Sequence, residues 1–223
     1  MTTKLLFQAL TKYFLGVILV GTLIFLPAGT LRFFKGWLLM GILFVPMFFA
    51  GGVLMIKNPQ LLKKRLSTDE KLGEQKTIVA ISGVMFAVGF VTAGLDFRFD
   101  WLDLPKSITV ISVMVFLLSY LLYAEVIREN AYLSRTIEIQ ENQKVVDTGL
   151  YGIVRHPMYT SSIFMFLSMP LILGSVYAFL IFLVYPVLIV QRIKSEEAFL
   201  ERELAGYKEY KAKVKYKLVP FVW

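Results

Sequence analysis

Long blocks of apolar residues divide this chain and limit what it can fold into. Four of them have the length of one membrane-spanning helix, at residues 5–27, 33–56, 77–95 and 108–127. A fifth, 158–190, is too long for one span, and Pro170 and Gly174-Ser175 offer a break that would give two short helices, about 158–173 and 176–193. We therefore predict an all-α, polytopic membrane protein with about six spans, the last two forming a tight helical hairpin.

The basic residues predict the orientation of these spans. With six spans, all but four of the 24 Lys and Arg residues fall on one side, the exceptions being Arg32, Lys35, Arg98 and Lys106. The positive-inside rule then places both termini and the hairpin's two ends on the cytoplasmic face. The first block is preceded by basic residues as in a signal peptide, but no small-x-small cleavage site follows it, so we expect a retained span.

Composition excludes several classes of site and partner. The chain has no Cys and one His, which rules out disulfides, thiolate ligands and multi-histidine metal sites. An apolar share of 57% argues against a soluble protein. The net charge of +8 therefore favours contact with anionic membrane lipids rather than nucleic acid. We expect neither a metal nor nucleic acid as a partner.

We treat residues 1–223 as one membrane domain. Residues 1–128 hold the first four spans, and residues 129–223 hold a polar connector, the helical hairpin and the C-terminal tail. Two connecting segments are predicted between the spans. The segment 57–76 is a basic polar loop, and 135–139 alternates enough to form a short extended piece.

Polar residues gather at three places that the hairpin would bring together. The stretch 149–159 precedes the hairpin and contains the single histidine, His156. Arg192, Glu196 and Glu197 lie where the second hairpin helix ends, and a tail with Tyr207 and Tyr210 follows. Because a hairpin returns the chain to its starting side, these groups are predicted to lie close to one another.

These groups have plain structural interpretations as well as a functional one. They could be flank charges, a surface Arg-Glu pair at i,i+4 and an amphipathic interfacial tail helix. Taken together, however, a helix start near Pro157 would offer N–H groups to an anion, the glutamates suit an ammonium group, and tyrosines suit a base or a cation. S-adenosylmethionine carries all of these groups and is compatible with the residues.

The residues 145–159, followed by an apolar hairpin, a Glu-Glu pair and Tyr-x-x-Tyr, resemble the integral membrane methyltransferases. These include isoprenylcysteine carboxyl methyltransferase and the phospholipid N-methyltransferases. The resemblance covers about residues 140–223. It implies S-adenosylmethionine in a cytoplasmic pocket capped by the helical tail, with a lipophilic acceptor entering from the bilayer. The implied cofactor contacts are Val145, Val146, Tyr151, His156, Pro157, Met158, Tyr159 and Glu196 or Glu197.

Two residues receive catalytic roles, Arg192 from this resemblance and Glu196 from the chemistry of an amine acceptor. Arg192 would orient a substrate carboxylate, and Glu196 would serve as a base for an amine acceptor. The resemblance has gaps: Leu204-Ala205-Gly206 replaces the family's Phe-Gly, which leaves the register of the two glutamates open by one residue. Gln143 stands where the carboxyl methyltransferases have a histidine.

The functional prediction is S-adenosylmethionine-dependent methylation of a lipophilic acceptor, with carboxyl O-methylation of an isoprenylcysteine-like substrate placed first. Phospholipid (ethanolamine) N-methylation is the first alternative. An NADPH-dependent sterol or steroid reductase is another, since these enzymes share Arg-His-Pro-x-Tyr, although Met158 stands where they have Asn. A non-catalytic membrane protein or a transporter stays open, but no span has a mid-membrane charge.

Overall fold

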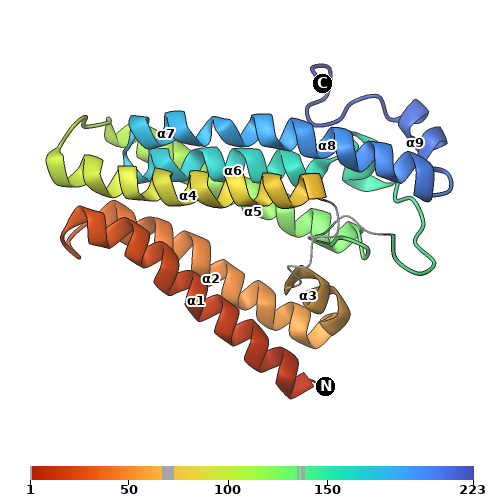
Figure 1. The fold of residues 1–223 in the computed structure, drawn as a ribbon, viewed down its shortest axis with the longest axis horizontal. Coiled ribbons are helices and arrows are strands. Elements are labelled where there is room, and N and C mark those ends of the chain that lie inside the picture. The colour runs from red at the N-terminus through yellow and green to blue at the C-terminus, as the bar shows by residue number, and fades with distance from the viewer. Residues whose placement is uncertain (1, 67–72, 135, 137–138) are drawn as a thin grey trace.

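A computed structural model describes residues 2–66, 73–134, 136 and 139–223 as a bundle of helices (Figure 1), and these residues contain no strand. The all-α prediction is confirmed. The elements are α1 (Thr2–Ala28), α2 (Phe34–Lys57), α3 (Pro59–Leu66), α4 (Gly73–Phe99), α5 (Lys106–Glu129), the 3₁₀ helix η1 (Gly149–Gly152), α6 (Pro157–Leu173), α7 (Val176–Phe182), α8 (Val184–Glu203) and α9 (Tyr207–Lys213).

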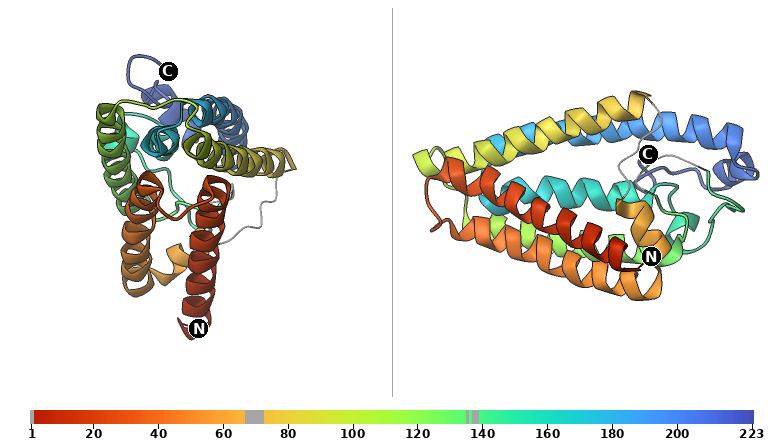
Figure 2. Two further views of the ribbon diagram at one scale, coloured as in Figure 1. Left: turned by 90° about the vertical axis from the view of Figure 1, so that its left-hand side faces the viewer. Right: turned by 60° about the horizontal axis from the view of Figure 1, so that its bottom comes forward.

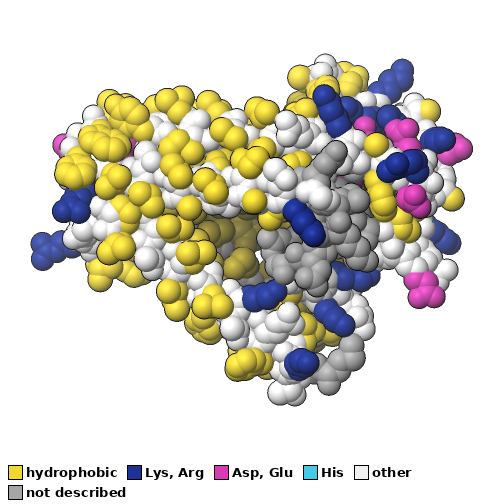
Figure 3. Space-filling view, viewed as in Figure 1, with side chains coloured by type: hydrophobic (Ala, Val, Ile, Leu, Met, Phe, Trp, Pro, Cys, Tyr) yellow, Lys and Arg dark blue, Asp and Glu magenta, His cyan; other side chains and the backbone are white. Residues whose placement is uncertain are grey.

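Five helical segments are long and apolar enough to cross a membrane, judged by length and composition: α1, α2, α4, α5 and the pair α7–α8. The remaining predicted span, α6, is a shorter apolar helix of 17 residues. Large apolar side chains cover the outer surface of the bundle (Figure 3), as expected for helices that face lipid rather than water.

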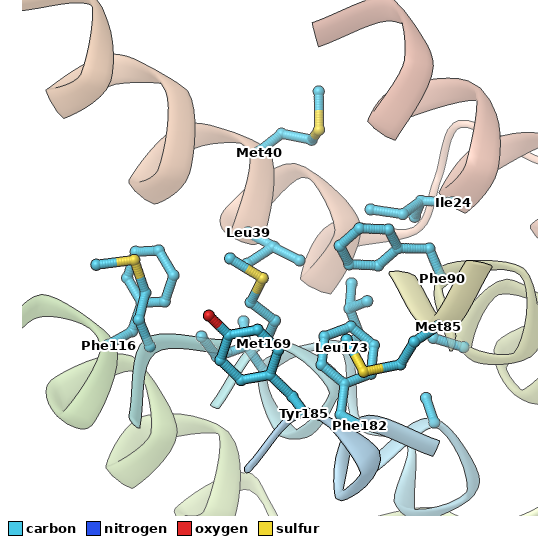
Figure 4. Close-up of a cluster of buried hydrophobic side chains, with 14 of the residues drawn as sticks. Ile24, Leu39, Met40, Met85, Phe90, Phe116, Met169, Leu173, Phe182 and Tyr185 are labelled. Atoms are coloured by element: carbon cyan, nitrogen blue, oxygen red, sulfur yellow. The ribbon is translucent and has the colours of Figure 1, made fainter. Parts of the chain in front are cut away.

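The core lies where α4 to α8 meet the first two helices. Phe182 of α7 is fully buried and lies beside Met85 and Phe90 of α4 (Figure 4). Gly89 permits this approach, since a Cβ at that position would overlap the Phe182 ring. On the other side of α4, a Cβ at Gly94 would overlap the carbonyl of Ile24 in α1. Small residues therefore let α4 pack closely against two neighbours.

The hairpin forms where the sequence predicted it. Gly174 ends α6 in the left-handed conformation with φ of 85°, which favours glycine. Ser175 then caps α7 by accepting a hydrogen bond from the Ala178 N–H at 3.1 Å. The returning helix runs back along α6, so the start of α6 and the end of α8 lie at the same end of the bundle. Figures 1 and 2 show α3, α9 and the C-terminal tail at this end.

Two segment predictions require correction or stay open. Within the predicted 57–76 loop, residues 59–66 form helix α3, and 67–72 lie outside the described residues. The predicted third span at 77–95 continues to Phe99, because Asp96 is buried in the last turn of α4 rather than solvated in a loop. The predicted extended piece at 135–139 falls mostly outside the described residues.

Candidate active site

The connector after α5 is fixed to the end of that helix by Glu129. Its Oε2 accepts a hydrogen bond from the Leu150 N–H at 2.9 Å. Gly149 has φ of 52°, and a Cβ there would overlap the Glu129 carboxylate, so glycine is required for both reasons. This contact begins the short helix η1 and sets the direction in which the chain approaches α6.

Tyr151 of η1 joins the connector to the tail. Its hydroxyl accepts a hydrogen bond from Asn130 Nδ2 at 2.9 Å, and its carbonyl accepts one from the Tyr210 hydroxyl at 2.8 Å. Burial raises the pKa of Tyr151 to about 12, although the Asn130 hydrogen bond acts in the opposite direction. Tyr151 therefore stays protonated at physiological pH.

The tail after α9 is bound along the start of α6. The N–H groups of Arg155 and His156 donate to the carbonyls of Tyr216 and Lys217, both at 2.9 Å, and Thr160 Oγ1 donates to the Leu218 carbonyl at 2.7 Å. We predicted that N–H groups at this helix start are free to bind an anion. The N–H of His156 is not free, because it donates to the tail. Pro157 is the first helical residue and has no N–H to satisfy.

A buried ion cluster connects α6, α8 and the tail. Glu197 Oε1 lies 2.7 Å from Arg155 Nε and 3.1 Å from His156 Nε2. Arg155 Nη1 also donates to the carbonyls of Val214 at 2.6 Å and Lys215 at 2.8 Å. The side chains of Arg155, His156 and Glu197 are each at most 5% exposed. Glu197 is thus surrounded by protein donors.

A second polar group lies one residue away on α8. The Tyr159 hydroxyl donates to Glu196 Oε2 at 2.5 Å and accepts from Arg192 Nε at 2.8 Å. Arg192 and Tyr159 are buried, whereas Glu196 is half-buried. The His156 and Tyr159 rings lie nearly parallel, with centroids 5.6 Å apart. Tyr159 therefore holds an arginine and a carboxylate in one fixed arrangement.

These groups line a partly open pocket with a cavity volume of about 120 Å³ between the connector, α6, α8 and α9. It contains most of the residues that the sequence assigned to the site: Val145, Val146, Tyr151, His156, Met158, Tyr159, Arg192 and Glu196. Pro157 and Glu197 are not among the lining residues. The geometry thus separates the two glutamates, with Glu196 on the wall and Glu197 behind it.

Tyr207 supplies an orphaned polar atom in this wall. Tyr207 lines the pocket, and its hydroxyl is buried and has no hydrogen-bond partner within the described part of the chain. Burial raises the pKa of Tyr207, and the charges of Glu197 and Glu196 raise it further. A buried, protonated hydroxyl without a partner is costly unless a ligand or water pairs with it.

Several lining residues were not predicted from the sequence, among them Asn130, Tyr132, Ser134 and Thr136. Asn130 could have been found only by knowing that α5 ends beside η1. The sequence also did not predict Arg65 of the basic helix α3, which contacts a lining residue: its Nη1 lies 3.9 Å from Met158 Sδ, and its guanidinium lies 5.1 Å from the Tyr123 ring centroid.

Over the described ranges, no group of three or more His, Cys, Asp or Glu side chains could hold a metal ion.

Residues 107–206 match the family model described as phospholipid methyltransferase. The matched segment begins in α5 and ends just before α9, so it contains the connector, the hairpin and both glutamates. The match confirms the resemblance to a membrane methyltransferase family over this part of the chain. No curated protein matches the chain.

Proposed function

We propose that this chain transfers a methyl group from S-adenosylmethionine to an acceptor borne by a membrane lipid. The observation that carries the proposal is the convergence of Glu196, Arg192 and the unpaired Tyr207 hydroxyl on one pocket, within or next to the segment that matches the methyltransferase family. Membrane lipids are the partners expected for a protein with several apolar helices and this family relationship.

The residues present fit this cofactor. The buried Tyr207 hydroxyl needs a hydrogen-bond partner, the Glu196 carboxylate suits an ammonium or sulfonium group, and Tyr151 and Tyr159 suit an aromatic base or a cation. Val145 and Val146 add an apolar wall from the connector. When bound, S-adenosylmethionine supplies an electrophilic methyl group on a sulfonium.

The phospholipid headgroup amine is the acceptor favoured by the family match. An ammonium must lose a proton before it can attack, and the Glu196 carboxylate is a base at the pocket wall. The Tyr159 hydroxyl orients that carboxylate through a 2.5 Å hydrogen bond. No covalent enzyme intermediate is required, so alignment and exclusion of water carry the catalysis.

An isoprenylcysteine-like carboxylate is the second acceptor, and the buried Arg192 at the pocket favours it. A carboxylate is ionised at neutral pH and needs no base, only an orienting cation. Gln143, which lines the pocket where the carboxyl methyltransferases carry a histidine, weighs against this acceptor.

Calorimetry on the detergent-solubilised protein tests the cofactor. We expect saturable binding of S-adenosylmethionine, weakened about tenfold or more in Glu196→Ala and His156→Ala because each loses a polar contact at the pocket wall. Glu203→Ala, an exposed position on the same helix, is the matched control. NADPH binding without S-adenosylmethionine binding would overturn the proposal in favour of a reductase.

Methyl incorporation from labelled S-adenosylmethionine distinguishes the acceptors. The protein is reconstituted into vesicles that contain phosphatidylethanolamine or a prenylated cysteine, and the lipids are extracted and separated. Label in the headgroup amine supports N-methylation. Base-labile label on the prenylcysteine indicates a methyl ester instead.

Tyr207→Phe is expected to have opposite effects on stability and on binding. Removing an unpaired buried hydroxyl should keep or raise the free energy of unfolding of the ligand-free protein, by about 1 kcal/mol. The same change should weaken S-adenosylmethionine binding about fivefold, because the ligand loses its hydrogen bond. Thermal unfolding and calorimetry measure the two effects. Lower stability with unchanged affinity would show that the hydroxyl serves the fold.

A further inference from the structure

A second pocket lies at the opposite end of the bundle from the active-site pocket. Its cavity volume is about 400 Å³, and its walls come from the α1–α2 loop, the end of α4, the α4–α5 loop and the α6–α7 turn. Figure 1 shows these segments at one end of the bundle. Charged residues of both signs line it: Arg32, Lys35, Asp96, Asp100 and Asp103. Methyl transfer as described above does not involve this pocket.

Asp96 is the buried charged residue of this pocket. It is 3% exposed and lines the cavity. Its Oδ1 accepts a hydrogen bond from the Leu102 N–H at 3.3 Å, but Oδ2 is buried and has no partner among the residues that the structure describes. An unpaired buried carboxylate oxygen is costly, so the site is built for a hydrogen-bond donor or a cation.

Two basic residues, Lys35 and Arg32, line the same cavity. Lys35 Nζ lies 4.0 Å from Asp103 Oδ1, a side chain that is 87% exposed, so this pair contributes little. A Cβ at Gly174 would overlap Lys35 Nζ, which places the ammonium over the hairpin turn at the cavity rim. Because Arg32 also lines the cavity, its basic residues suit an anionic group such as a phosphate.

Aromatic side chains place the pocket at the depth of lipid headgroups. Phe33 and Phe97 stack in its wall with ring centroids 4.0 Å apart. Around it, Phe34, Trp37 and Trp101 have large exposed surfaces, as is typical of residues at a membrane–water interface. Figure 3 shows basic side chains at this end, next to the apolar middle of the surface.

From these observations we propose that this pocket binds the zwitterionic headgroup of an aminophospholipid. Asp96 accepts from the ammonium, while Lys35 and Arg32 bind the phosphate. Because Asp96 needs a donor N–H, the site should prefer a primary ammonium over the trimethylated ammonium of phosphatidylcholine, which has no N–H. The proposal does not depend on methyl transfer.

Native mass spectrometry of the intact protein with retained lipid tests this. The protein is equilibrated with equal amounts of phosphatidylethanolamine and phosphatidylcholine of the same chain length. We expect about a tenfold preference for phosphatidylethanolamine that is reduced in Asp96→Asn and kept in the control Glu203→Gln. Lipid bound at the active-site pocket is common to all three proteins, so the difference between Asp96→Asn and the control reports the second pocket.

Three results would overturn the proposal. One is equal retention of both lipids by the unchanged protein, and another is an unchanged preference in Asp96→Asn. The third is displacement of the lipid by free phosphoethanolamine at the same concentration, which would make the ligand a soluble compound. A thermal unfolding series guards against misfolding: Asp96→Asn should be at least as stable as the unchanged protein without lipid. The unchanged protein and Glu203→Gln should gain more stability from phosphatidylethanolamine than Asp96→Asn does.

Discussion

Glu197→Ala is expected to lower the free energy of unfolding by about 3–5 kcal/mol, the range typical for breaking a buried ion pair from one side. The change leaves Arg155 buried without its carboxylate and removes the acceptor for His156. Arg155 also binds the tail carbonyls of Val214 and Lys215, so the tail should loosen along with it. Thermal unfolding in detergent measures the stability, and limited proteolysis of the tail measures its attachment.

Two further variants show whether the loss of stability comes from the buried charge of Glu197. Glu203→Ala, exposed on the same helix, should change stability by less than about 0.5 kcal/mol. Glu197→Gln keeps an acceptor oxygen but removes the charge, so it should fall between the unchanged protein and Glu197→Ala. If Glu197→Ala kept its stability and lost only cofactor affinity, Glu197 would be a ligand contact instead of a counter-ion.

Arg192→Ala is expected to reduce methyl transfer about a hundredfold while S-adenosylmethionine affinity stays within about threefold. Arg192 holds the Tyr159 hydroxyl, which in turn holds the Glu196 carboxylate, so its loss should misplace the groups around the acceptor. A comparison of kcat/KM with the calorimetric affinity for the cofactor separates the two effects.

Arg192→Lys refines this test. A lysine keeps the charge but cannot reproduce the planar guanidinium, so we expect partial activity with a carboxylate acceptor. With an amine acceptor the positive charge has no direct attraction to the substrate, and Arg192→Lys should behave much like Arg192→Ala. Equal losses of cofactor affinity and activity in Arg192→Ala would contradict the assigned role.

The helices were predictable because their signals are local. The pair Gly174-Ser175 interrupts an apolar run, and α6 ends at Leu173 and α7 begins at Val176 as predicted. The second hairpin helix was predicted to end near residue 193, but it divides into α7 and α8 and continues to Glu203. The end of α4 was predicted at residue 95, too early, because a charged residue such as Asp96 is expected to lie in solvent. Only the packing of the α4–α5 loop over Asp96 shows that it is buried.

The candidate site was only partly predictable for a related reason. Sequence alone left Glu196 and Glu197 equivalent, but adjacent helical residues point about 100° apart. On α8 this directs Glu196 toward the Tyr159 hydroxyl and Glu197 toward Arg155. The tail contacts were invisible because backbone carbonyls such as those of Tyr216 and Lys217 make them, and such contacts leave no pattern in side-chain type.

The shortness of α6 has a consequence for the energy of catalysis. Its 17 residues span about 25 Å, less than the roughly 30 Å of a typical hydrocarbon core. The pocket at its first turn can therefore open at the depth where lipid headgroups lie. An acceptor held at that depth keeps its chains in the bilayer and avoids the roughly 0.8 kcal/mol that each methylene group would cost on transfer to water.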